Sequence, residues 1–203
     1  TNTLPFHSET IAQIDLEQFD ISTIKLFAVN NETFVISDSE HSAVLLGNCD
    51  YICTTSPTLL IKYIQDRIVQ ICRDRIISFP ISQPKEEDII TYTAPNQITC
   101  CDIGGDFIFI SVDNEDHKHI HSIVMKPDLS VVADKEIGSV FDATFCEDYL
   151  AIATKCDGND HSALSLYTVD LNPGETGIHL TSSITFMTFT SQELYVATDD
   201  GYV

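Results

Sequence analysis

The sequence predicts an all-β protein, and three observations lead to that prediction. The apolar runs have the length of strands, are rich in Ile and Val, and alternate with polar residues, as in FIFISV at Phe107–Val112 and LYVAT at Leu194–Thr198. Clusters of Gly, Asp, Asn and Pro separate these runs, and signals of long helices are almost absent. The third observation is that a strand–turn–strand unit recurs along the chain.

The recurring unit consists of a strand, a tight polar turn and a second strand. Five segments contain it: Ile24–Leu46, Leu60–Ile81, Ile98–Met125, Val140–Leu171 and Ser183–Val203. Their second strands, marked by Phe34, Ile68, Ile108, Leu150 and Leu194, follow one another at intervals of 34, 40, 42 and 44 residues. This is the length of one four-stranded blade, so the sequence predicts a WD40-like β-propeller with blades of four antiparallel strands.

The blades are assigned in chain order to residues 14–50, 51–90, 91–135, 136–180 and 181–203, and the last of them is incomplete. A small twisted sheet cannot bury both faces alone, so neighbouring blades are expected to stack around an axis. We therefore expect residues 1–203 to form a single propeller domain or part of one: about five blades of a larger ring, or a ring whose closure depends on further sequence. The turns expected inside the blades are Asn30–Asn31, Gln65–Asp66, Gly104–Gly105, Glu147–Asp148 and Ser191–Gln192.

Two other β architectures fit the density of strands. The Gly-His and Trp-Asp blade signature is missing, and the chain has no Trp. A β-sandwich or a double barrel therefore stays open beside the propeller.

Charge limits the possible partners. The chain has 10 basic and 31 acidic residues, a formal net charge of −21, which opposes approach to a phosphate backbone. We expect no direct nucleic-acid binding. The acidic clusters in turns, such as Glu86–Glu87–Asp88, form a solvated rim or face a protein partner with a basic surface. No apolar run approaches the roughly 20 residues of a membrane-spanning helix, and no secretory signal is visible at the start, so no membrane association is expected.

The cysteines indicate a reducing compartment. There are seven of them, without a C-x-x-C pair, and several lie inside apolar runs where a thiol packs as a small hydrophobe. Cys49 and Cys53 could share a metal only if the turn folded back. Cys100 and Cys101 are adjacent, so in a strand they would face opposite ways. Both pairs are interpreted as packing residues.

The chain resembles the middle propeller of the triple-propeller scaffold family. The similarity runs over most of the chain in element order, with sparse identities. Its most specific matches are Pro57-Thr58 after the first hairpin and Ile68-Val69-Gln70-Ile71, which looks like the family's I-V-Q-V strand. Seven residues past that Gln the family commonly carries Arg, whereas this chain has Ile77.

This family includes the large subunit of damaged-DNA-binding protein, the large subunit of the cleavage and polyadenylation specificity factor, and the corresponding subunit of spliceosomal factor 3b. The resemblance implies a non-catalytic scaffold of a large complex in the nucleus and cytoplasm. We favour an adaptor of a cullin-RING ubiquitin ligase involved in DNA repair or chromatin. The alternative within the family is a scaffold subunit of a splicing or polyadenylation factor. Protein partners are expected, and no cofactor or small-molecule substrate.

One cluster suggests chemistry of a different class. HKHIH places His117, His119 and His121 at alternate positions, so in a strand the three imidazoles would share one face, and Asp113, Glu115 and Asp116 could add oxygen ligands. A metal-dependent propeller hydrolase or lyase is the enzymatic alternative. Same-face neighbours on a strand lie roughly 7 Å apart, however, so we favour an exposed hairpin or edge strand on which His and Lys discourage pairing. We predict no nucleophilic site, because no G-x-S-x-G elbow occurs.

Overall fold

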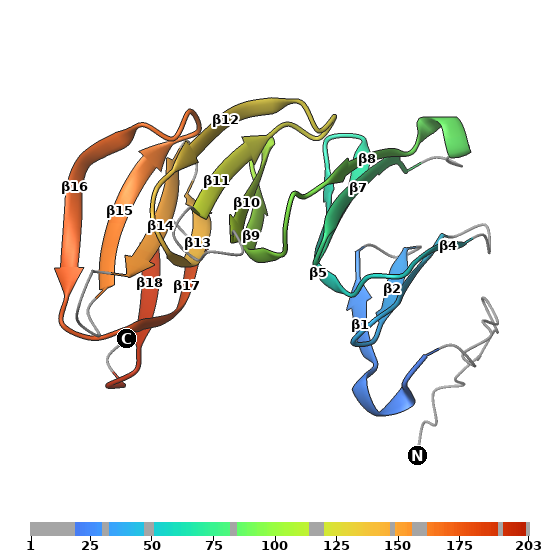
Figure 1. Ribbon diagram of the computed structural model, residues 1–203, viewed down its shortest axis with the longest axis horizontal. Helices are drawn as coiled ribbons and strands as arrows, with labels where there is room; N and C mark the ends of the chain where they lie inside the picture. Colours follow the sequence, from blue (N-terminus) through green and yellow to red (C-terminus); the bar gives the residue numbers. More distant parts are fainter. Residues whose placement is uncertain are drawn as a thin grey trace, which may run out of the picture. The chain divides into compact units, whose positions relative to one another are not determined.

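The chain forms two compact units, Thr1–Thr58 and Leu59–Val203 (Figure 1). The structure, a computed structural model, describes residues 19–29, 33–46, 51–81, 85–113, 120–146, 149–155, 162–190 and 193–201; the side chains of 51–54 and 175–176 lie outside this description. The described residues contain no helix with the length and hydropathy that a membrane span needs.

The described residues of the first unit form one antiparallel sheet in the order β1-β2-β3-β4. A short 3-10 helix, η1 (Ile21–Thr23), precedes it, and its strands are β1 (Lys25–Ala28), β2 (Phe34–Ser37), β3 (Ser42–Leu45) and β4 (Tyr51–Thr54). The spacing of the sequence assigned Tyr51–Thr54 to the second blade. In the structure these residues pair with β3, from Ser42↔Thr54 to Leu45↔Tyr51, so the second sheet begins at Thr58.

The second unit contains three four-stranded sheets and one two-stranded sheet among its described residues. The second sheet has β5 (Thr58–Ile64), β6 (Arg67–Cys72), β7 (Arg75–Pro80) and β8 (Ile90–Thr93), with η2 (Glu86–Asp88) before β8. The third has β9 (Ile98–Gly104), β10 (Phe107–Asp113), β11 (Ile120–Met125) and β12 (Val131–Glu136). The fourth has β13 (Val140–Cys146), β14 (Tyr149–Lys155), β15 (Ser162–Thr168) and β16 (Pro173–Leu180), and the fifth has β17 (Ile184–Thr190) and β18 (Glu193–Thr198).

The predicted repeat is present in every sheet. The residues that mark the second strands lie on the second strand of each sheet: Phe34 on β2, Ile68 on β6, Ile108 on β10, Leu150 on β14 and Leu194 on β18. Neighbouring strands that follow each other in the chain pair in order, which is the meander of a propeller blade. The all-β prediction is confirmed.

The turns agree with the sequence in part. Gln65–Asp66 does connect β5 to β6, and Gln65 has a φ of 55°. The turn expected at Gly104–Gly105 lies one residue later, at Gly105–Asp106, because Gly104 still belongs to β9. Gly105 supplies the positive φ, 57°, that this turn requires. The remaining expected turns, Asn30–Asn31, Glu147–Asp148 and Ser191–Gln192, lie outside the described residues.

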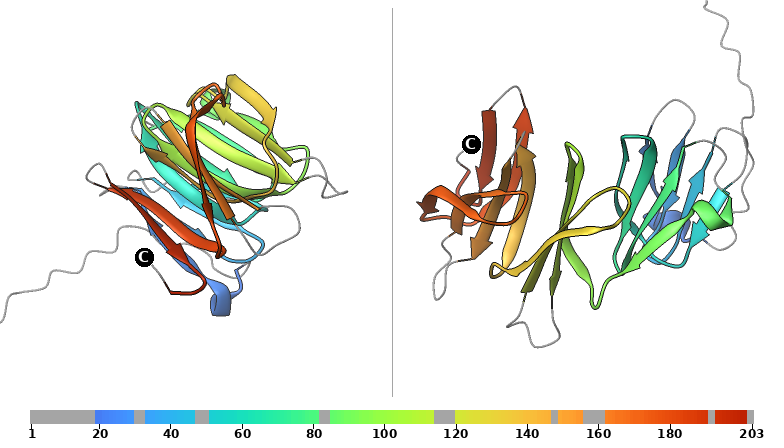
Figure 2. Two further views of the ribbon diagram at one scale, coloured as in Figure 1. Left: turned by 90° about the vertical axis from the view of Figure 1, so that its left-hand side faces the viewer. Right: turned by 90° about the horizontal axis from the view of Figure 1, so that it is seen from above.

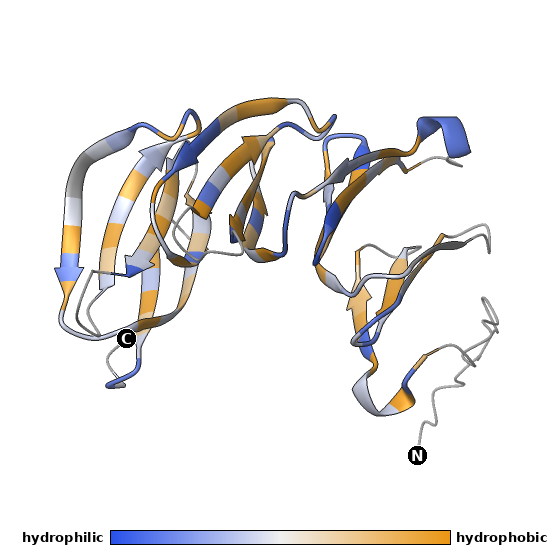
Figure 3. Ribbon diagram, viewed as in Figure 1, coloured by the Kyte–Doolittle hydropathy of each residue, from blue (hydrophilic) through white to orange (hydrophobic). Residues whose placement is uncertain are grey.

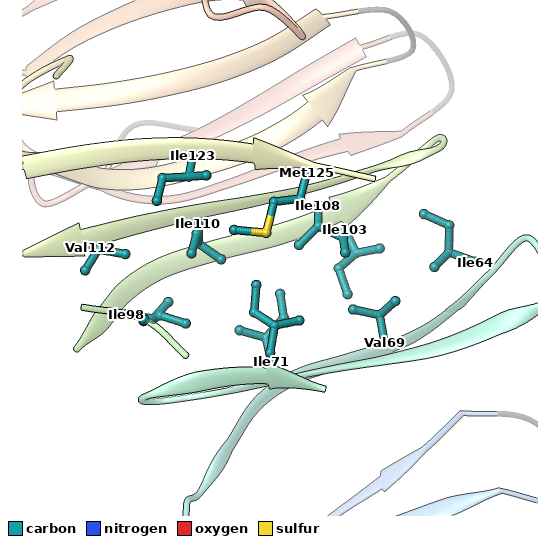
Figure 4. Packing of buried hydrophobic residues seen from close by; sticks show 12 residues of the cluster. Ile64, Val69, Ile71, Ile98, Ile103, Ile108, Ile110, Val112, Ile123 and Met125 are labelled. Atoms are coloured by element: carbon teal, nitrogen blue, oxygen red, sulfur yellow. The ribbon is translucent and has the colours of Figure 1, made fainter. Parts of the chain in front are cut away.

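The core of the second unit lies between successive sheets, which stack face to face (Figure 2). Figure 4 shows the cluster between the second and third sheets, where Val69 and Ile71 meet Ile108 and Ile110, all fully buried. Similar clusters join the third sheet to the fourth and the fourth to the fifth. Figure 3 shows the apolar residues along these strands. Each fully buried Ile or Val contributes about 1.5–3 kcal/mol, so the stacking of sheets stabilises the unit.

Candidate functional site

The structure places only one of the three candidate histidines. His117 and His119 lie outside the described residues, as do Glu115 and Asp116. His121 lies on β11, which is an interior strand between β10 and β12. The expectation was an exposed hairpin or an edge strand, and His121 lies on the second strand of the β10–β11 hairpin. The edge-strand form is wrong for this residue, because β12 continues the sheet beyond β11.

The ring of His121 faces two carboxylates on β12. Its Nδ1 lies 2.9 Å from Oδ1 of Asp134, and its Nε2 lies 4.0 Å from Oε1 of Glu136. His121 pairs with Val112 on its other side. Among the described side chains, no group of three or more His, Cys, Asp or Glu is placed to hold a metal ion.

The described cysteines pack in the cores. Cys100 faces the cluster shared with the fourth sheet, whereas Cys101 faces the cluster shared with the second, so the two thiols point in opposite directions as predicted. Burial raises the pKa of both thiols, that of Cys101 to about 12. A thiol with a raised pKa is a poor nucleophile. Cys49 and the side chain of Cys53 lie outside the described part of the chain.

Ser37, Asp38 and His41 are the residue types of a nucleophilic site, but their bonds hold the first sheet together. Ser37 Oγ lies 3.2 Å from the main-chain oxygen of His41 and accepts a bond of 2.9 Å from Thr58 N. Asp38 accepts bonds from the main-chain N–H groups of Asp20, Glu40 and His41. Ser37 bonds the carbonyl of His41 and not its ring, so the His41 imidazole is not placed as a base for this hydroxyl.

Polar side chains tie the first strands of neighbouring sheets in the second unit. Lys62 Nζ on β5 lies 3.1 Å from Asp102 Oδ1 on β9, and Asp102 Oδ2 accepts a bond of 2.9 Å from Phe145 N on β13. Asp142 Oδ2 on β13 then accepts a bond of 2.6 Å from Met187 N on β17. A first strand has an edge with unpaired N–H groups, and these carboxylates satisfy two of them.

The ties were not predicted from the sequence. The signal that could have found them is a lone Asp inside an apolar strand, as in ITCCDIG at Ile98–Gly104 and VFDATFC at Val140–Cys146. Such a residue is buried only at a cost unless it has a partner, and that partner lies about one blade away in sequence.

The first strands also carry exposed aromatic side chains. Tyr63 on β5 is 49% exposed, Phe141 on β13 is 43% exposed and Phe186 on β17 is 57% exposed. Each is next in sequence to a residue of the ties, namely Lys62, Asp142 or Met187. These three side chains, which we call the first-strand aromatics, therefore lie on strands whose relative positions are fixed by hydrogen bonds.

A cavity of about 440 Å³ opens among the turns of the second and third sheets. We call it the turn cavity. It is lined by Gln65, Asp66, Arg67, Asp106, Phe107, Lys126, Pro127 and Asp128. Its lining comes from the β5–β6, β9–β10 and β11–β12 turns, so three separate chain segments contribute charged groups to one site.

The strand that carries the resemblance to the triple-propeller family, Ile68–Ile71, is buried. Gln70 on β6 and Ile77 on β7 are direct cross-strand partners, and their exposed fractions are 0% and 6%. The position at which the family commonly carries Arg therefore lies opposite the Gln of the I-V-Q-V strand. In this chain that position belongs to the core.

Comparisons with solved structures identify the fold. The chain is similar to Hsv2 of Kluyveromyces marxianus, with a TM-score of 0.61 and 12% identity over 87% of this chain and 57% of Hsv2. It is equally similar to BBS1N, solved in complex with ARL6DN, with a TM-score of 0.61 and 12% identity over 90% of this chain and 64% of BBS1N. A computationally designed protein, Ika4, has a TM-score of 0.50 and 10% identity over 80% of this chain and 99% of its own.

These likenesses confirm the β-propeller, since Hsv2 and BBS1N are propellers, in place of the sandwich or double barrel. The chain spans less than two thirds of the length of either. No protein-family model and no curated protein matches the sequence. At such low identity the comparisons establish the fold, and the resemblance to the triple-propeller family stays a prediction.

Proposed function

We propose that this chain is a non-catalytic scaffold that binds protein partners. The observation that carries the proposal is the set of first-strand aromatics, Tyr63, Phe141 and Phe186, each about half exposed. Aromatic side chains are enriched at the cores of protein interfaces because they bury a large area at a small cost in side-chain entropy. Here they lie on strands that the Asp102 and Asp142 ties hold in place, which gives a partner a preorganised surface.

The charge of the chain selects the kind of partner. With a net charge of −21, the chain attracts basic protein surfaces over long distances and repels acidic ones. Such steering raises association rates and falls with ionic strength. The preferred partner is therefore a protein with a basic surface that presents apolar groups to the aromatic side chains.

A more specific form of the proposal is an adaptor of a cullin-RING ubiquitin ligase involved in DNA repair or chromatin. Its support is the resemblance at Pro57-Thr58 and at the buried strand Ile68–Ile71. A splicing or polyadenylation scaffold is the alternative with the same support. Cys100, Cys101 and Cys146 form no disulfide, which supports a reducing location such as the nucleus and cytoplasm.

Affinity purification of the full-length protein, followed by mass spectrometry, tests the proposal. A cullin among the recovered proteins would support the ligase adaptor, and splicing or polyadenylation subunits would transfer the assignment to the other branches. The variant Tyr63→Ser/Phe141→Ser/Phe186→Ser should lose the partner.

The matched control is Val131→Ser/Tyr149→Ser/Ile178→Ser, which alters three side chains of similar exposure away from the first strands. Equal recovery of partners by both variants would contradict a role of the first-strand aromatics. Hydrolysis or lyase activity that requires added Zn²⁺ would contradict the non-catalytic assignment and favour the metal-dependent alternative.

A further inference from the structure

Hydrogen bonds to the neighbouring chain hold Arg67 and the β11–β12 turn of the turn cavity in place. Arg67 Nε donates to Ser78 Oγ at 2.8 Å, and its Nη2 donates to the main-chain oxygens of Ser78 and Asp88 at 3.0 and 3.1 Å. Ser78 Oγ in turn donates to Pro127 O at 2.6 Å, which fastens the β11–β12 turn to β7. The cavity therefore persists without a ligand.

The β11–β12 turn, which forms one side of the cavity, is held by further hydrogen bonds. Asp128 Oδ1 accepts bonds from Ser130 N at 3.0 Å and from Ser130 Oγ, and these bonds lower the pKa of the Asp128 carboxyl. Asp128 is consequently ionised at neutral pH. Asp66 and Asp106 are exposed at the other two turns. Each turn thus presents one carboxylate to the cavity.

The balance of charge in the cavity favours a cation. Three carboxylates, Asp66, Asp106 and Asp128, stand against two cations, Arg67 and Lys126. Arg67 directs Nε and Nη2 at oxygens of Ser78 and Asp88, so these donors are already used. A cavity of about 440 Å³ has the volume for the head of a long side chain. Phe107 and Pro127 in its lining can contact the apolar stem of that side chain.

We propose that the turn cavity binds an arginine or lysine side chain from a basic segment of a protein partner. The inference rests on the proposed scaffold function and names one of its contact sites. The guanidinium or ammonium group pairs with Asp66 and Asp106, whose carboxylates lie on turns of adjacent sheets, with Asp128 beside them. The overall charge of −21 brings the basic segment to the surface, and the cavity determines where its side chain enters.

The test uses a capped tri-arginine peptide titrated into the full chain labelled with ¹⁵N. Amide signals of 65–67, 106–107 and 126–128 should shift together. In Asp66→Asn/Asp106→Asn the affinity should fall about five- to tenfold, the usual scale for two partly exposed ion pairs. Raising the ionic strength should weaken the binding further.

The control variant Asp170→Asn/Glu193→Gln removes the same two charges from exposed positions outside the cavity and should bind as the wild type does. Equal weakening in both variants would show that only the overall charge matters and would overturn the site. Shifts of the same amides by capped tri-glutamate or inorganic phosphate would overturn it too, because the cavity would then be an anion site held by Arg67 and Lys126.

Two outcomes separate this inference from the scaffold proposal. If Asp66→Asn/Asp106→Asn recovers the same partners as the wild type in affinity purification and tri-arginine does not bind, the cavity assignment is wrong and the scaffold stands. If tri-arginine binds as expected and the full-length protein recovers no partner, the scaffold proposal is wrong while the cation site stands.

Discussion

Asp102 is the residue on which the packing of three first strands depends. Its carboxylate contacts Lys62 Nζ and Phe145 N, and its side chain is only 16% exposed. Removing this partly buried acceptor leaves the N–H group of Phe145 without its partner, whereas Lys62 Nζ keeps its bond to Ile103 O. An N–H group that loses its acceptor in this way costs about 1–3 kcal/mol. We therefore expect Asp102→Ala to lower the free energy of unfolding by that amount in denaturant titrations. Asp170→Ala, at an exposed turn, should change it by less than about 0.5 kcal/mol; equal values for the two variants would contradict the tie.

Asp142 gives the second unit a distinctive dependence on pH. Burial raises the pKa of its carboxyl above 3.8, and the bonds from Met187 N and Ala143 N only partly oppose this. A carboxyl with a raised pKa keeps its proton more strongly in the folded state, so its contribution is fully present below 3.8 and is lost as pH rises through the folded pKa. The difference in unfolding free energy between wild type and Asp142→Asn should thus fall as pH rises from 3 to 7. A difference that rises with pH would contradict the raised pKa of Asp142.

Asp38 should show the opposite dependence in the first unit. Burial would raise the pKa of this carboxyl, but bonds from the N–H groups of Glu40, Asp20 and His41 outweigh it and lower the pKa below 3.8. Its contribution is therefore present above 3.8 and is lost as pH falls through the folded pKa. Hydrogen exchange of β2 and β3 amides should show that Asp38→Asn destabilises the first sheet more at pH 7 than at pH 3. An equal effect at both values would refute the bonds as the cause.

At the scale of elements, the first strands share a device that the spacing of the sequence does not reveal. In the third, fourth and fifth sheets one extra residue, Thr99, Phe141 or Thr185, interrupts the pairing of the first strand with the second. Beyond each of these bulges, the end of the second strand donates a hydrogen bond to the residue that precedes the first strand. In the fourth sheet, for example, Lys155 N donates to Ser139 O at 2.9 Å. A bulge re-aims the strand, and Phe141 is exposed there.

The order of strands could be predicted because apolar alternation and blade length depend on local sequence. Phe34, Ile68, Ile108, Leu150 and Leu194 were all placed on the correct strands. Contacts between sheets could not be predicted, because Asp102 accepts its hydrogen bond from Phe145 only when two sheets stack. The same limit explains β11: alternation indicates a strand at His121 but does not show that β12 covers its edge.

Gly104 tests how closely the first strands approach. A Cβ at this position would overlap the Cβ of Phe145 on β13, a contact that side chains do not tolerate. Gly104→Ala should therefore force β9 and β13 apart and lower the free energy of unfolding by about 1–3 kcal/mol, the usual cost of overpacking. Thermal unfolding followed by circular dichroism measures it. Unchanged stability would mean that the strands adjust at no cost, and Phe145→Leu, which keeps the Cβ, should not relieve the effect.

At the scale of the whole molecule, the second unit contains its own core. The clusters that join its four sheets consist entirely of residues after Leu59. Removing the first unit leaves every one of these contacts in place. The fragment Leu59–Val203 should therefore fold cooperatively, because a propeller is stabilised mainly by contacts between adjacent blades.

The amide NMR signals of β9–β15 in this fragment should overlay on those of the full chain. The control fragment Ile98–Val203 lacks the second sheet and uncovers the apolar face formed by Ile103, Ile108 and Ile110. It should bind a hydrophobic dye and aggregate, because a large exposed apolar face favours association. If Leu59–Val203 is unfolded while the full chain is folded, the second unit depends on the first, and stacking between its own sheets is insufficient to hold it.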